Sequence, residues 1–248
     1  MLQGFYNLTS SMITQNRKLD VASNNIANIS TPGYKKDTMM ATTFKEEMLS
    51  RTGNTNRGNS SNLNTTSKIV TAQETITNYG QGAFEETANP LNIALSKNGF
   101  FEIETSNGKA YTRNGSFITD EEGYLSLPGE GKVMGTSGAI FLDTDKVSIN
   151  SSGEIYDGAG SYIDTIKVVD FANYDQLNKD LAGNITTNSE PMQVDGGIMQ
   201  NTLEQSNVLM VEEMTAMMTS QRAIQSASQI IKMYDQMMAK STTEIGRV

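Results

Sequence analysis

The N-terminal thirty residues constrain the fold most, because apolar side chains recur there at the three- and four-residue steps of a helix. No Gly or Pro interrupts the chain between Phe5 and Thr31, and Pro32-Gly33 then forms a turn that a helix cannot continue through. The sequence therefore predicts a long amphipathic helix that ends at this turn. The steps fall on Phe5, Leu8, Met12, Gln15, Leu19, Ala22, Ile26 and Ile29, of which only Gln15 is polar.

The C-terminal fifty residues carry a second helical pattern, in which an apolar side chain occurs at every seventh position. No Gly or Pro occurs from Ile198 to Ile245. We therefore expect a C-terminal helix over residues 198–248. The apolar column comprises Leu203, Met210, Met217, Ile224, Ile231 and Met238, and Met214 belongs to a weaker companion column.

Neither helix is expected to be stable alone, because isolated helices are marginal in water. Asn24, Asn25 and Asn28 lower the helix propensity of the N-terminal segment further. Its partner is either the C-terminal helix of the same chain or the helices of neighbouring copies, and the spacing leaves both open. The methionines of the last helix also have two interpretations. They fill a core, or they make adaptable contacts between neighbours that are not identical.

The middle of the chain has a different character. Residues 35–68 predict an extended, low-complexity connector, with a short amphipathic helix over Met39–Leu49. Residues 69–197 contain most of the aromatic residues and Asn-Gly pairs such as Asn98-Gly99 and Asn114-Gly115, which are typical of tight hairpins. We predict an α+β fold. Long helices from residues 1–34 and 198–248 pack as a coiled-coil-like layer and enclose a central antiparallel, hairpin-rich β domain.

The composition excludes several classes of function. The 248 residues carry a formal net charge of −9, which argues against nucleic acid or an anionic membrane as a partner. The chain has neither His nor Cys, so thiolate metal sites and histidine-dependent nucleophilic catalysis are excluded. We expect no catalytic residue, no cofactor and no metal. With no membrane span and Arg17 as the first cation, we expect either cytoplasmic residence or export without a cleaved signal.

Three short motifs resemble ligand-binding loops and are interpreted as turns. Gly129-Glu-Gly-Lys132 lacks the lead-in of a phosphate loop, and Val133 replaces its Ser or Thr. Asp143-Thr-Asp145 begins like a calcium loop, but Val147 stands where an oxygen ligand is needed. Asp120-Glu-Glu122 is typical of a charged hairpin tip.

The stretch from Leu19 to Lys36, LDVASNNIANISTPGYKK, resembles the N-terminal signature of the bacterial flagellar rod and hook axial proteins. Three further stretches are similar to that family in the same order, so the resemblance covers nearly the whole chain. They are Asn89–Phe101, Tyr111–Leu125 and Leu203–Ala223.

The resemblance implies a structural subunit of the flagellar basal-body rod. It would be exported through the flagellar type III apparatus and polymerise with itself and with other rod and hook axial proteins around a central channel. The chain is too short for a hook subunit; proximal and distal rod positions stay open, with Pro90–Phe101 favouring the proximal one. The resemblance assigns assembly contacts to Phe5, Leu8, Met12, Leu19, Ala22, Ile26, Ile29, Leu203, Met210, Met214, Met217, Ile224, Ile231 and Met238. It assigns the shape of the helix exit to Asn24, Asn25, Asn28, Pro32 and Gly33.

Two rival interpretations come from other classes. The first is a β-domain binding module, for example for a glycan, on a helical oligomerisation stalk. The second is an enzyme that uses carboxylates alone, which requires two acidic side chains to converge in a pocket of the β domain.

Overall fold

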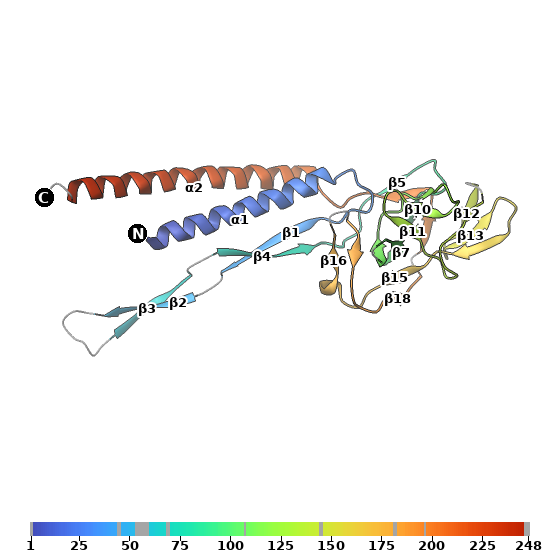
Figure 1. The fold of residues 1–248 in the computed structure, drawn as a ribbon, viewed down its shortest axis with the longest axis horizontal. Coiled ribbons are helices and arrows are strands. Elements are labelled where there is room, and N and C mark those ends of the chain that lie inside the picture. The colour runs from blue at the N-terminus through green and yellow to red at the C-terminus, as the bar shows by residue number, and fades with distance from the viewer. Residues whose placement is uncertain are drawn as a thin grey trace. The chain divides into compact units, whose positions relative to one another are not determined.

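The computed structural model describes residues 2–43, 46–52, 60–67, 70–106, 108–143, 146–180, 183–195 and 197–245. The chain forms two compact units (Figure 1). The first, called the helical unit, comprises Met1–Ile26, Asp37–Ile76 and Leu209–Val248. The second, called the β unit, comprises Ala27–Lys36 and Thr77–Val208. Both chain ends therefore belong to the helical unit.

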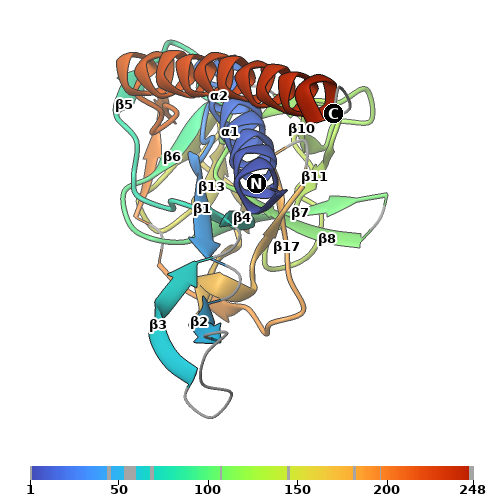
Figure 2. The same cartoon turned by 90° about the vertical axis from the view of Figure 1, so that its left-hand side faces the viewer.

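The helical unit contains the two helices that the sequence predicts at the ends of the chain. Helix α1 spans Leu2–Ala27 and helix α2 spans Met210–Ile245. They run side by side in opposite directions, as both views show (Figures 1 and 2). Within the described residues, neither helix combines the length and the apolar character that crossing a membrane requires. The predicted N-terminal helix is confirmed, although it ends at Ala27, so that Ile29 lies in the following turn.

The start of the C-terminal helix is corrected by the structure. Residues 198–204 form two short strands, β19 (Ile198–Gln200) and β20 (Thr202–Glu204), and not the first turns of α2. Between them Asn201 has a φ of 56°, a left-handed conformation that no helix continues through. Leu203 therefore lies in a strand opposite Glu85 and outside the helical column. Its step of seven from Met210 is coincidental.

Between the two helices, the described residues of the helical unit form β structure. Strand β1 (Asp37–Thr43) pairs with β4 (Val70–Thr77), and β2 (Glu46–Thr52) pairs antiparallel with β3 (Ser60–Ser67). The short helix predicted over Met39–Leu49 is wrong, because its described residues belong to β1 and β2. The Thr-rich composition of this segment favours strands over helix.

The β unit is built from short antiparallel strands, as its Asn-Gly pairs predict. The central pair is β7 with β8, in which Phe101 faces Thr112 and Thr105 faces Gly108. This pair belongs to a nine-stranded sheet with the path β16-β17-β8-β7-β11-β10-β9; β15 also pairs with β7, and β18 pairs with β15. Smaller sheets are β12-β13-β14, β19-β6 and β20-β5. The bounds not yet given are β5 Phe84–Glu86, β6 Ile93–Leu95, β7 Phe100–Thr105, β8 Gly108–Thr112, β9 Ile118–Thr119, β10 Leu125–Leu127, β11 Gly131–Val133, β12 Val147–Ile149, β13 Glu154–Asp157, β14 Tyr162–Thr165, β15 Val168–Asp170, the 3₁₀ turn Tyr174–Gln176, β16 Asn178–Lys179, β17 Ile185–Thr186 and β18 Met192–Gln193.

Strand β7 separates two clusters of buried apolar side chains in the β unit. Phe101 and Ile103 belong to the larger cluster, in which the Phe101 ring meets the edge of Phe117 at 5.2 Å between centroids. Phe100 belongs to the smaller cluster, together with Tyr111 and Phe171. Successive side chains of a strand point to opposite faces, so the two neighbouring phenylalanines fill two different cores. The predicted central antiparallel β domain is thus present.

Candidate assembly surfaces and helix-exit junction

In the helical unit, the end of α1 is joined to the start of α2 through one buried side chain. Asn25 is 0% exposed. Its amide nitrogen donates to the carbonyl of Asp37 at 2.8 Å and to the Glu213 carboxylate at 3.2 Å. Its amide oxygen accepts from the backbone N–H of Asp37 at 3.0 Å. The Asn25 amide thus pairs with residue 37 as a neighbouring strand would, which satisfies its hydrogen-bonding groups without solvent.

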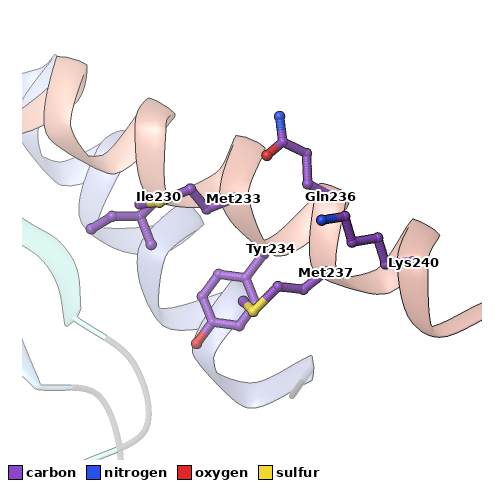
Figure 3. A pocket seen from close by; sticks show the side chains of 6 residues that line it. All are labelled: Ile230, Met233, Tyr234, Gln236, Met237 and Lys240. Carbon is purple, nitrogen blue, oxygen red and sulfur yellow. The ribbon is translucent and has the colours of Figure 1, made fainter.

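The other end of α1 meets α2 at Gly4. A Cβ atom at Gly4 would lie 3.0 Å from the Tyr234 hydroxyl oxygen, so the glycine makes room for that ring. Figure 3 shows the ring pointing from α2 toward α1. The two antiparallel helices have equal lengths between these contacts, from Gly4 to Asn25 and from Glu213 to Tyr234. The buried positions between them are mostly small, namely Thr14, Ala22, Ser220 and Ala227.

Large apolar side chains of α2 lie instead on its exposed surface. Met214 is 50% exposed and Val211 is 78% exposed. We call these exposed side chains, which together cover more than one side of the helix, the outer apolar face of α2; they are Met210, Val211, Met214, Met218, Ile230, Met233, Met237 and Met238. Near the end of the helix this surface is hollowed, and a depression of about 390 Å³ is lined by Ile230, Met233, Tyr234, Gln236, Met237 and Lys240 (Figure 3). An exposed apolar surface of this extent marks a contact site.

The residues assigned to assembly contacts differ in their exposure to solvent. Ala22 is buried, whereas Phe5, Met210, Met214 and Met238 are exposed. The partly buried ones on the helices are Leu8, Met12, Leu19, Ile26, Met217, Ile224 and Ile231. Ile29 and Leu203 lie in the β unit and on neither helix. Exposure therefore varies along the apolar column of α2, which is partly buried at Met217, Ile224 and Ile231 and exposed at Met210 and Met238.

The residues assigned to the helix exit also differ in their contacts and exposure. Asn28 accepts a hydrogen bond from the Thr31 side chain and closes the first turn after α1 with its carbonyl. Gly33 has a φ of 69°, and a Cβ there would lie 2.3 Å from the carbonyl carbon of Arg113. Only glycine fits both conditions. Pro32 is partly buried beside it, and Asn24 is exposed.

A buried ion cluster in the β unit follows Gly33 along the chain. Lys35 Nζ lies 2.5 Å from Glu204 Oε1, and Arg113 Nη1 lies 3.1 Å from Glu204 Oε2. All three side chains are nearly inaccessible to water. Gly82 N–H also donates to Glu204 Oε1, and Lys35 Nζ donates to the carbonyl of Gly80. Burial lowers the pKa of Lys35, although the Glu204 carboxylate beside it acts in the opposite direction.

Further hydrogen bonds join the same two segments. Asn207 Oδ1 accepts from the N–H of Lys36 at 2.7 Å, and Asn207 Nδ2 donates to the carbonyl of Asn78 at 2.8 Å. The N–H of Gly33 donates to the carbonyl of Glu204 at 2.7 Å. We call this arrangement, from Gly33 to Lys36 and from Glu204 to Asn207, the helix-exit junction. It fixes the chain that leaves α1 against the chain that enters α2.

Sequence reasoning missed this cluster, because Lys35, Arg113 and Glu204 are far apart in the chain. The available signal was their location: each belongs to one of the four stretches that carry the family resemblance. A charged residue in such a stretch is often paired in the fold, because a buried charge requires a partner. The partner itself could not be identified without the fold.

The described residues contain no group of three or more His, Cys, Asp or Glu side chains placed to hold a metal ion. What the fold does provide is a helix pair with an outer apolar face, and a β unit in which the segment that follows α1 is fixed to the segment that precedes α2. This combination is typical of a structural protein.

The comparisons with known proteins identify its family. Residues 5–35 match the flagella basal body rod protein family, residues 94–157 the flagellar hook protein FlgE/F/G D1 domain, and residues 199–244 the flagellar basal body rod FlgEFG protein C-terminal family. The chain belongs to the flagellar basal-body rod proteins, and it is a structural subunit of the bacterial flagellar rod. This places it in the basal body of the flagellum.

Curated relatives match over almost their whole length. The flagellar basal-body rod protein FlgG of Bacillus subtilis is 34% identical over 261 residues, with 96% of this chain and 97% of the relative covered. The flagellar hook-basal body complex protein FlhO of the same organism is 29% identical over 273 residues, with both chains covered completely. The flagellar basal-body rod protein FlgF of Caulobacter vibrioides is 29% identical over 245 residues, with 96% of each covered.

Proposed function

We propose that copies of this chain polymerise through α1 and α2 into the axial drive shaft of the flagellum, which transmits torque and encloses an export channel. The observation that carries this proposal is the outer apolar face of α2. In water these side chains favour contacts that remove them from solvent. A coiled-coil-like layer of helices from neighbouring copies covers them. The proposal assigns no catalytic step to the chain.

Methionine suits this face, because its flexible and polarisable side chain adapts to neighbours in slightly different positions. In a helical polymer the neighbours along different directions are not equivalent. Met210, Met214, Met217, Ile224, Ile231 and Met238 on α2, and Phe5, Leu8, Met12, Leu19, Ala22 and Ile26 on α1, supply the contacts in this proposal. Neighbouring axial proteins of the rod and hook bind through the same helices.

Delivery to the rod belongs to the same proposal. We infer that the chain leaves the cytoplasm through the flagellar type III export apparatus. The family membership supports this route. Export requires an unfolded or partly unfolded chain, and helices that are marginal outside an assembly suit that requirement.

The helix-exit junction has a mechanical role in this proposal. Torque applied to the helices pulls on the two segments that connect them to the β unit. The Lys35–Glu204–Arg113 cluster and the Asn207 hydrogen bonds hold these segments together, so neither is extended separately. Charge-assisted hydrogen bonds away from water are the strong ones.

A matched pair of substitutions tests the assembly proposal. Met214 on α2 and Met192 in the β unit are equally accessible, at 50% and 52% exposure. We expect Met214→Asp to abolish polymerisation of the purified chain, measured by sedimentation, and to abolish motility in cells that depend on this subunit. Met192→Asp controls for an added charge on an exposed methionine. Equal behaviour of the two variants would refute assembly through the outer face of α2.

A further inference from the structure

The ionisable side chains of this chain are divided unequally between its two units. The helical unit contains 9 acidic and 10 basic residues, whereas the β unit contains 19 acidic and 9 basic residues. The formal charges are therefore +1 and −10, which together give the −9 of the whole chain. The entire negative excess lies in the β unit.

This division decides which parts of two copies can approach one another. Two β units repel each other, because the energy of two like charges grows with the product of the charges. Two helical units have almost no net charge and expose the outer apolar face of α2. The hollow on this face is lined by apolar and neutral side chains with Lys240 as its one charged residue (Figure 3). A second copy, approaching with its own helical unit, is therefore the occupant that fits this face.

The two units cannot act independently, because the chain passes between them at residues 26–27, 36–37, 76–77 and 208–209. Every helical unit that joins an assembly brings its acidic β unit with it. The apolar contact is favourable and the accompanying charge is unfavourable, whatever the placement of the β unit.

We infer that the outer apolar face of α2 binds a second copy of this chain, and that repulsion between the acidic β units opposes this binding, so that ionic strength controls assembly. The inference rests on the proposed function and adds the sign of its salt dependence. Salt strengthens the assembly. A contact built on opposite charges weakens in salt, because screening removes the attraction.

The range of salt follows from the screening length. It is about 30 Å at 0.01 M ionic strength and about 10 Å at 0.1 M. Charges on neighbouring β units therefore repel each other over a longer range at 0.01 M than at 0.1 M ionic strength. The apolar contacts of α2 are not screened. Sodium chloride is the appropriate salt, because sulfate also strengthens apolar association by its exclusion from protein surfaces.

The experiment measures the lowest concentration at which the purified full-length chain polymerises, by sedimentation, between 0.01 M and 0.3 M sodium chloride. We expect this concentration to fall by about tenfold as salt rises through this range. A matched pair of triple variants separates the location of the charge from its total. Both variants change the net charge of the chain from −9 to −6.

The first variant, Glu86→Gln, Glu121→Gln and Glu190→Gln, removes three exposed carboxylates from the β unit and leaves it at −7. Repulsion between two such units falls to about half, because it scales with the square of the charge. We expect this variant to polymerise in low salt. The second variant, Asp20→Asn, Glu74→Gln and Asp235→Asn, removes three exposed carboxylates from the helical unit. We expect it to keep the salt requirement of the unmodified chain.

The outcomes separate this inference from the proposed function. Polymers that form equally well at all salt concentrations, or that dissolve as salt rises, overturn the control by charge and leave assembly through α2 standing. Equal salt responses of the two variants overturn the assignment of the repulsion to the β unit. A chain that forms no polymer under any of these conditions overturns the proposed function, and this inference with it.

Discussion

The amide nitrogen of Asn25 lies 3.2 Å from the carboxylate of Glu213, and this contact joins the last turn of α1 to the first turn of α2. The two residues are 188 positions apart in the chain. Their contact therefore closes the helical unit, with the whole β unit inserted between them.

Replacement of Asn25 by Asp removes the only N–H donor of this side chain and places a second carboxylate beside Glu213. The donor serves both Asp37 and Glu213, so we expect the helical unit to lose about 2–4 kcal/mol of stability. Urea unfolding, followed by far-ultraviolet circular dichroism, measures this loss. Asn16→Asp is the control, because Asn16 is exposed on the same helix. Equal midpoints for the two variants would show that the Asn25 contacts contribute nothing.

Gly33→Ala tests the close approach at the helix-exit junction. The new Cβ meets the Arg113 backbone, in addition to the strain of a positive φ. Gly129→Ala is a matched control, since Gly129 has a φ of 77° and open space around its Cα. We expect about 1 kcal/mol of destabilisation at Gly129 and at least about 2 kcal/mol more at Gly33. Thermal unfolding of the two variants measures the difference, and similar losses would mean that the chain adjusts freely at Gly33.

The raised pKa of Tyr174 predicts how the stability of the β unit changes at alkaline pH. Burial, together with a hydrogen bond to the Asp170 carboxylate, raises the pKa of Tyr174 from 10.0 to about 12. The folded state thus holds the phenolic proton more tightly than the unfolded state, and this contribution is complete below pH 10. It is lost as pH rises through about 12. We expect unfolding midpoints to fall more steeply over this range in the unmodified chain than in Tyr174→Phe.

Ultraviolet absorbance at alkaline pH checks the same assignment independently, because ionised tyrosine absorbs at longer wavelength. Tyr174→Phe should remove the component that titrates near pH 12. Tyr162→Phe, at an exposed position, is the control for the loss of one tyrosine. If the component persists in Tyr174→Phe, another residue is responsible for it.

Hydrogen exchange tests whether the helices need neighbours. In the monomer, at low micromolar concentration, we expect the amides of α1 and α2 to exchange much faster than those of β7 and β8. Both helices expose apolar surface, so opening them costs less free energy in the monomer than in a polymer where neighbours pack against them. In the polymer the helix amides should become protected, while β7 and β8 stay as they are. Equal protection in the monomer would mean that α1 and α2 stabilise each other fully, as in the stalked binding module.

The parts that could be predicted from the sequence are those with local signals. The seam from Phe5 onward and the Pro32-Gly33 turn define α1, and the Asn-Gly pairs define the hairpins of the β unit. The predicted start of α2 was wrong, because the seven-residue step extends by chance to Leu203. The left-handed conformation of Asn201, which excludes a helix there, has no signal in the local pattern. Strands β1 to β4 lack apolar alternation, so a segment of Thr, Asn and Ser appeared to be a connector.

The candidate site likewise has one part that the sequence predicts and one part that it does not. The Met-rich face of α2 was visible as a pattern, but periodicity alone could not separate its inward side from its outward side. Met217 is partly buried and Met214 is exposed, although both were assigned the same role. The junction was not predictable, because Lys35 and Arg113 share one distant partner, the carboxylate of Glu204. Such pairs are specified by the fold and by no local pattern.

The hydrogen bond between Asn207 and the carbonyl of Asn78 has a consequence for how this family of chains can change. The segment between these two residues leaves and returns at one point, like a cassette with its ends joined. Loops inside this segment can be lengthened or trimmed with no change in the distance that the flanking chain must cover. Arg113 and Glu204 are the parts that must be retained, because Gly33 and Lys35 outside the segment pack against them.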